Sequence, residues 1–122
     1  MPEVVQVAKP QSLADGFADD RGSPVEIQGL KVDPLVYRIT ARGRPVRVSG
    51  TEFRLLHFLM SNPEVAHPRD HLVRRVWGGQ SAVGDRAVDV YVRRLRRALS
   101  QHGYDRFIQT VRSVGYRFST LE

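Results

Sequence analysis

One segment of this chain, residues 85–99 (DRAVDVYVRRLRRAL), combines arginines with apolar residues in a pattern that suits contact with nucleic acid. At helical spacing, one face of the segment is basic and holds Arg86, Arg93 and Arg97. A guanidinium group donates two hydrogen bonds in a fixed fork, which matches phosphate oxygens and the edge of guanine. Asp89 is the only acid inside the segment, and Val90 is a bare apolar residue that could contact the methyl group of thymine. The pattern therefore predicts a recognition helix for duplex DNA.

A helix over residues 85–99 would also have an apolar face that packs on a core. The apolar residues of that face recur at helical spacing and are Val88, Val92, Leu95 and Leu99. No proline or glycine interrupts the run, and Asp85 stands where an N-cap acceptor belongs. We therefore expect a continuous helix with Asp85 as its N-cap.

Other partners also fit a basic amphipathic helix taken by itself. Such a helix can lie on an anionic membrane or in the groove of an acidic protein, and its arginines can also be merely solvated. A protein that packages nucleic acid through the phosphate backbone alone is a further alternative. Backbone binding does not need Val90 and Asp89 at their positions, which favours sequence-specific binding. The main alternative is a protein-interaction module that binds an acidic partner.

The net charge of the chain supports a polyanionic partner. The 122 residues carry a formal charge of +6 at pH 7. Residues 1–24 carry −2, so the remainder carries +8, and residues 86–117 hold eight arginines against two acids. A basic face on a small domain points to nucleic acid.

Composition disfavours several other classes of protein. The chain has no cysteine, no apolar stretch of membrane-spanning length and no secretory signal, which fits a cytoplasmic protein. It also has no nucleophile–base pair, glycine-rich phosphate loop or paired acidic cluster, so we expect neither an enzyme nor a cofactor. His67 and His71 have the spacing of two zinc ligands on a helix, but the sequence places no third ligand. We therefore expect both histidines to be structural.

The chain divides into a tail and one domain. Residues 1–24 show no sustained period and are rich in Asp, Gly, Pro and Ala, so we expect a linker or flexible tail there. The domain is expected over residues 25–122. Apolar and polar residues alternate over residues 25–33 and 35–48, with turn signals at Asp33-Pro34 and at 42–45, which predicts short antiparallel strands.

Two further helices are expected before the arginine-rich one. Ser49 and Glu52 have the spacing of a capping box, which predicts a helix that ends near residues 61–63. Its inward-facing residues would be Phe53, Leu56, Leu59 and Met60. A short second helix is expected over residues 69–77, with Gly78 at its end.

The last part of the domain predicts a β-hairpin. Residues 104–118 contain two short apolar runs, and Gly115 is available between them for a positive φ. An N-terminal antiparallel sheet, three helices and a C-terminal hairpin wing together describe an α+β winged helix-turn-helix fold.

Four motifs carry a resemblance to a known family. They are SGTEFRLLHFLMSNP, VWG, DRAVDVYVRRLRRAL and IQTVRSVGYRFST. The chain resembles the OmpR/PhoB family over about residues 25–122, and most of all its phosphate-regulon members. Output domains of that family are winged helices that regulate transcription in bacterial two-component systems. The resemblance implies a response-regulator output domain, with an activator role as in the phosphate regulon.

The resemblance also implies roles for individual residues. Arg94 matches the base-contacting arginine of the family, and Asp89 and Val90 match neighbouring groove-facing positions. The positions that hold phosphates or line the groove rim are Arg86, Tyr91, Arg93 and Arg96. The wing positions are Thr110, Arg112 and Tyr116, of which the arginine enters the minor groove.

Two further expectations concern partners. The surface that touches the sigma subunit of RNA polymerase in phosphate-type activators matches Trp77, Gly78, Val83 and Asp85. The family's output domains bind direct repeats head to tail, so the resemblance implies a monomer in solution and a tandem arrangement on double-stranded DNA. Three positions depart from the common pattern, namely Pro68 in place of a Ser or Thr cap, Ala87 in place of Thr and Ser113 in place of Gly.

Overall fold

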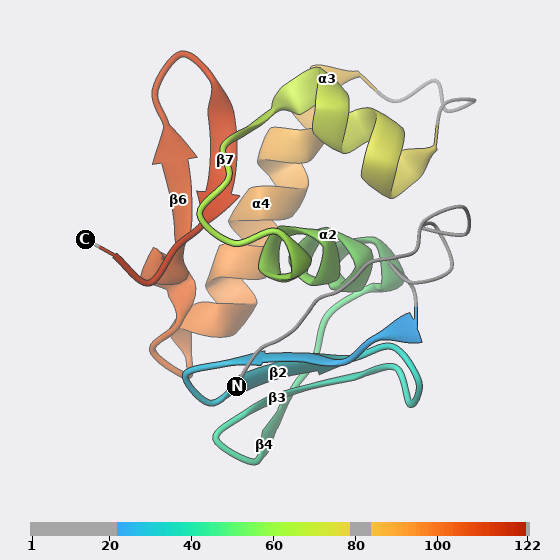
Figure 1. Ribbon diagram of the computed structural model, residues 1–122, viewed down its shortest axis with the longest axis vertical. Helices are drawn as coiled ribbons and strands as arrows, with labels where there is room; N and C mark the ends of the chain where they lie inside the picture. Colours follow the sequence, from blue (N-terminus) through green and yellow to red (C-terminus); the bar gives the residue numbers. More distant parts are fainter. Residues whose placement is uncertain (1–21, 79–83, 122) are drawn as a thin grey trace.

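The computed structural model describes residues 22–78 and 84–121. An N-terminal antiparallel sheet lies below a layer of helices, and a C-terminal hairpin stands against the helices (Figure 1). This arrangement is the α+β winged helix-turn-helix fold expected from the sequence, with the elements in the expected order. Within the described ranges, no helix is long and apolar enough to cross a membrane.

Four short strands form the N-terminal sheet in the order β1-β2-β3-β4, all antiparallel. They are β1 (Val25–Ile27), β2 (Leu30–Asp33), β3 (Arg38–Ala41) and β4 (Arg44–Val46). Two-residue turns join β1 to β2 and β3 to β4, and both residues of each turn have positive φ. The core side of the sheet is made of Leu30, Val32, Ile39, Ala41 and Val46.

The expected strand over residues 35–48 is wrong at its start. Leu35, Val36 and Tyr37 lie in the turn between β2 and β3, and all three are exposed. The Asp33 carboxylate accepts a hydrogen bond of 3.0 Å from the Leu35 backbone N–H, which closes a turn in place of a strand. Tyr37 has a φ of 57°, so the chain becomes extended only from Arg38 onward.

The first described helix, α2 (Gly50–Ser61), begins at the expected capping box. The Ser49 side chain accepts from the Glu52 N–H at 3.4 Å, and the Glu52 carboxylate accepts from the Ser49 N–H at 3.3 Å. The predicted inward face is confirmed, because Phe53, Leu56, Leu59 and Met60 are all buried. The helix lies across the N-terminal sheet and packs against α4 (Figure 1).

The expected second helix is present but changes pitch. It consists of α3 (Arg69–Leu72) followed by the π-helical turn η1 (Val73–Trp77), and Gly78 ends it with a φ of 91°. Pro68 stands at the N-cap without a side-chain hydrogen bond. A strand that the sequence did not indicate, β5 (His67–Pro68), precedes the helix and pairs with the C-terminal hairpin. Two residues are too few for a recognisable alternation.

The arginine-rich helix is α4 (Asp85–Ser100), and its predicted apolar stripe is confirmed. All four stripe residues, Val88, Val92, Leu95 and Leu99, are buried in the core. The expected N-cap is wrong by one position, because the cap residue is Gly84 and Asp85 is the first helical residue. Asp85 still stabilises the helix from this position, because an acid in the first turn interacts favourably with the helix macrodipole.

The C-terminal hairpin consists of β6 (Ile108–Val111) and β7 (Gly115–Phe118), after the 3₁₀ turn η2 (Asp105–Phe107). The expected positive φ at Gly115 is wrong, because the residue with positive φ in the turn is Ser113 at 68°. Gly115 serves a different purpose. A Cβ atom there would overlap the carbonyl oxygen of His67 and lie 3.0 Å from its carbonyl carbon. Glycine at this position therefore allows β5 to approach β7.

Candidate nucleic-acid interface

The outer face of α4 presents a row of cations around one apolar side chain. Val90 is 38% exposed, whereas the valines of the core stripe are fully covered. The exposed arginines of the helix are Arg86, Arg93, Arg94 and Arg97. This is the arrangement expected from the sequence for a helix that contacts both bases and phosphates.

Arg94 has a defined support although it is exposed. Its guanidinium carbon lies 5.0 Å from the ring centroid of Tyr91, within the range of a cation–π interaction. Tyr91 in turn meets Trp77 edge to face, with ring centroids 5.4 Å apart. The half-buried Tyr91 therefore connects the candidate base-contacting arginine to the end of the second helix.

Asp89 is engaged within the protein. Its Oδ1 atom accepts hydrogen bonds from the Nε of Arg69 at 2.7 Å and from the hydroxyl of Tyr116 at 2.6 Å. Burial acts to raise the pKa of the Asp89 carboxyl, but the hydrogen bonds from Tyr116 and Arg69 outweigh it and hold the pKa below its ordinary value. The ion pair of Asp89 is thus with Arg69 of α3, and not with Arg93 one turn along its own helix.

Tyr116 lies beneath the interface and is only 5% exposed. The guanidinium carbons of Arg69 and Arg96 lie 5.2 and 5.6 Å from its ring centroid. Burial, and then the hydrogen bond to the Asp89 carboxylate, raise the pKa of the Tyr116 phenol. The sequence marked Tyr116 as a contact residue, but its surroundings suit a supporting role.

Arg96 joins α4 to the first strand of the hairpin. Its Nε and Nη2 atoms donate to the carbonyl oxygen of Ile108 at 3.0 and 2.8 Å, and Nη2 also donates to Thr110 Oγ1 at 2.9 Å. Thr110 is exposed, and the hairpin tip beyond it exposes Arg112. The wing and the recognition helix are therefore fixed side by side.

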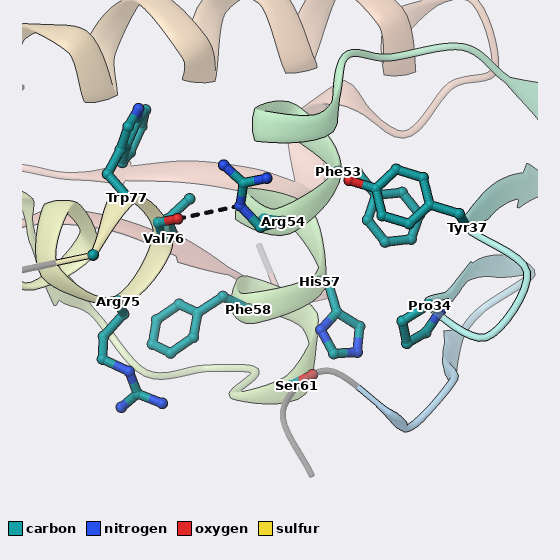
Figure 2. A pocket seen from close by; sticks show the side chains of 11 residues that line it. Pro34, Tyr37, Phe53, Arg54, His57, Phe58, Ser61, Arg75, Val76 and Trp77 are labelled. Atoms are coloured by element: carbon teal, nitrogen blue, oxygen red, sulfur yellow. Dashed lines mark hydrogen bonds between the residues drawn. The ribbon is translucent and has the colours of Figure 1, made fainter. Parts of the chain in front are cut away.

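Of the residues expected to contact polymerase, Trp77 and Gly78 lie at the end of the second helix and Asp85 is the first residue of α4. Trp77 is half-buried, Gly78 and Asp85 are exposed, and Val83 lies outside the described residues. A pocket of about 480 Å³ adjoins Trp77 and Gly78, and Figure 2 shows the aromatic and basic side chains around it. Its lining includes Tyr37, Phe53, Phe58, Arg54 and Arg75.

Two contacts fix the walls of this pocket. Tyr37 stacks on Phe53 with ring centroids 4.2 Å apart, and the Arg54 Nε donates to the Val76 carbonyl oxygen at 3.2 Å (Figure 2). The exposed tyrosine of the β2–β3 turn is thereby held against α2. A concave surface with aromatic walls and cationic groups suits an acidic protein segment that carries an apolar side chain.

His67 and His71 lie together beside the ring of Phe58. His67 is buried, and its ring centroid lies 4.8 Å from that of Phe58 and 5.6 Å from that of His71. Burial, together with the neighbouring His71, lowers the pKa of His67. Among residues 22–78 and 84–121, no group of three or more His, Asp or Glu side chains could hold a metal ion. His57 of α2 lies 2.8 Å from the Ser23 carbonyl oxygen through its Nε2 atom.

Sequence reasoning missed Arg69. It begins the second helix, 20 residues before Asp89 in the chain, and no local spacing connects the two. The only available signal was that Asp89 is the single acid beyond the first residue of an arginine-rich helix, which implies a partner without identifying it.

Comparison with known proteins adds to this geometry. Residues 43–118 match the family model described as "Transcriptional regulatory protein, C terminal". The chain is 51% identical over 96 residues to the phosphate regulon transcriptional regulatory protein PhoB of Escherichia coli, covering 79% of this chain and 42% of that protein. It thus spans about two fifths of the length of that relative.

Solved structures agree with the sequence match. The Klebsiella pneumoniae RstA DNA-binding domain, in complex with RstA box, has a TM-score of 0.69 and 30% identity, over 80% of this chain and 97% of that one. The response regulator DrrB, a Thermotoga maritima OmpR/PhoB homolog, has a TM-score of 0.70 and 27% identity, over 87% of this chain and 49% of that one.

Proposed function

The chain belongs to the OmpR/PhoB-type family of transcriptional regulatory C-terminal domains, and we propose that it binds double-stranded DNA sequence-specifically as the output domain of a two-component response regulator. The family assigns the chain a role in transcription regulation and not in catalysis. The observation that supports specific binding best is the face of α4, where exposed Val90 lies among arginines beside a wing held by Arg96. The RstA domain, which has the same fold, is solved with its DNA box.

Contacts in two grooves follow from this arrangement. The helix α4 enters the major groove, where Arg94 and Val90 contact base edges and Arg86 and Arg93 contact phosphates. Arg112 on the wing enters the adjacent minor groove, which is narrow and strongly negative at A·T-rich stretches. Asp89 and Tyr116 hold the interface together from beneath.

The test is the effect of Arg94→Ala on a preferred duplex and on a random duplex at the same salt concentration. A bidentate base contact contributes about 1–3 kcal/mol, so we expect about a 5- to 150-fold loss on the preferred duplex and a flattened base preference. Arg38→Ala is the matched control, because it removes one exposed cation from β3, away from the helix. Equal weakening of both duplexes by Arg94→Ala would mean that this residue contacts phosphate only.

Assembly on DNA follows the family pattern in this proposal. A single winged helix contacts few base pairs, so high affinity needs a second copy on the same duplex. We expect direct repeats about 10–10.5 bp apart, which bring both recognition helices to one face of the DNA. A preference for inverted repeats in gel-shift assays would contradict the tandem arrangement. We expect the protein to be cytoplasmic, and to be a monomer in solution without DNA.

Contact with the sigma subunit of RNA polymerase is the second part of the proposal. It is supported by the pocket beside Trp77 and Gly78, whose aromatic walls and arginines suit an acidic protein segment. Trp77→Ala and Val83→Ala are expected to abolish activated transcription, and Val83→Ala is expected to leave DNA binding intact. Loss of DNA binding in both variants would instead mean a structural role.

Two further parts of the proposal concern the target genes and residues 1–24. Identity of about half to PhoB supports genes of the phosphate regulon as targets. Residues 1–24 are proposed to be the linker that precedes the domain.

The alternative function is that of a module whose arginine face on α4 binds an acidic protein. Equal affinity for all duplexes, together with tight binding of an acidic peptide, would favour this alternative.

A further inference from the structure

Both strands of the wing are attached to the recognition helix through a single face of α4. Asp89 accepts from Tyr116 of β7 at 2.6 Å, and Arg96 donates to Ile108 and Thr110 of β6 at 2.8 to 3.0 Å. Positions 89 and 96 are seven residues apart, which is about two helical turns, so both side chains leave the same face of the helix. The wing is therefore attached to α4 at two positions that lie about two helical turns apart.

The Asp89 attachment also includes α3. Arg69, the first residue of α3, donates to the same Asp89 oxygen that accepts from Tyr116, and its guanidinium group lies over the Tyr116 ring. Arg96 lies over the same ring, so the buried phenol is flanked by two guanidinium groups and bound to one carboxylate. The three elements that meet here are both helices of the helix-turn-helix and the second strand of the wing.

The chemistry of this cluster suits precise positioning. Hydrogen bonds with an ionised partner are shorter and stronger than neutral ones, and linked bonds support one another. The side chains of Arg69 and Asp89 are 34% and 41% exposed, and an ion pair so exposed contributes little to stability by itself. The geometric effect of the cluster is larger, because loss of the Tyr116 hydroxyl removes the side-chain hydrogen bond between β7 and α4.

We propose that Arg69, Asp89 and Tyr116 form a clamp, made of positioning residues, that presets the wing for the minor groove while α4 occupies the major groove. The inference rests on the proposed function. A preset wing binds without first being ordered, so the contribution of Arg112 to affinity depends on the clamp. In a clamp variant the same contact must also order the wing, and its contribution to affinity decreases.

The experiment is a double-mutant cycle on the 122-residue chain, with the duplex that the unmodified chain selects from a random pool as probe. Dissociation constants are measured for Arg112→Ala alone and in combination with Tyr116→Phe, which removes only the hydroxyl. We expect the loss caused by Arg112→Ala to be about three- to tenfold smaller in the Tyr116→Phe background. Asp89→Asn, which keeps the side-chain volume, provides a second background with the same expectation.

Tyr104→Phe is the matched control. Tyr104 is also buried, and its hydroxyl donates to the Gln28 carbonyl oxygen at 2.7 Å, away from the wing. A general loss of stability would act alike in both tyrosine variants, whereas the clamp predicts a smaller Arg112 effect only with Tyr116→Phe. The proposal is overturned if the Arg112 effect is unchanged in the Tyr116→Phe and Asp89→Asn backgrounds, or equally reduced with Tyr104→Phe. Failure of the unmodified chain to select any duplex would overturn the proposed function as well.

Discussion

Gly115→Ala is expected to destabilise the domain strongly, because two backbone segments touch at this position. A Cβ atom on residue 115 would overlap the His67 carbonyl oxygen and lie 3.2 Å from the Pro68 Cα. Strands β5 and β7 would have to separate, which disturbs the pairing of His67 with Tyr116. Overpacking costs about 1–3 kcal/mol, and each backbone hydrogen bond that breaks adds about 1 kcal/mol. We expect a total loss of about 2–4 kcal/mol.

The assay is thermal unfolding followed by circular dichroism. For a domain of about 100 residues, this loss corresponds to a fall in melting temperature of about 10–25 °C. Gly22→Ala is the control, because nothing lies within 4 Å of a Cβ atom at that position and its φ is not positive. A melting temperature of Gly115→Ala within about 2 °C of the unmodified chain would refute the close approach of β5 to β7.

Three further outcomes are expected. Ser49→Ala should lower the free energy of unfolding by about 1 kcal/mol, since it removes the acceptor of the capping box; an unchanged denaturant midpoint would contradict this. Because the pKa of His67 is lowered in the folded state, mainly by burial and then by His71, its contribution to stability is complete above an ordinary pKa near 6.5 and is lost as the pH falls below it. His67→Gln should therefore reduce the loss of stability between pH 7.5 and 5.5, and equal losses in both proteins would contradict this assignment. Arg112→Ala should abolish the affinity difference between duplexes with A·T and G·C flanks, and a retained difference would place another group in the minor groove.

The helices could be predicted from the sequence because each depends on local spacing. The stripe from Val88 to Leu99 and the Ser49–Glu52 capping box involve residues three or four positions apart, which are neighbours on any helix. The bounds of the strands were predicted less well, because an alternation of apolar and polar residues does not show where a turn ends and a strand begins. Leu35–Tyr37 has the composition of a strand, but one hydrogen bond from the Leu35 backbone N–H to the Asp33 carboxylate makes it a turn.

The candidate site was predicted only in part. The exposed arginines and Val90 follow from the helical period, so their placement on α4 needed no knowledge of the fold. The partners of Asp89 lie 20 and 27 residues away, on elements whose approach depends on tertiary packing. The same holds for Gly115, whose small size matters because β5 passes against it. Contacts of this kind leave no periodic signal in the sequence.

Selection of duplexes from a random pool by the 122-residue chain, at fixed salt, tests sequence-specific DNA binding most directly. The proposed function predicts one enriched sequence that occurs as direct repeats about 10–10.5 bp apart. It also predicts that Arg94→Ala loses the enrichment while Arg38→Ala keeps it. A pool without any enriched sequence, bound with equal affinity throughout, would contradict sequence-specific recognition by α4.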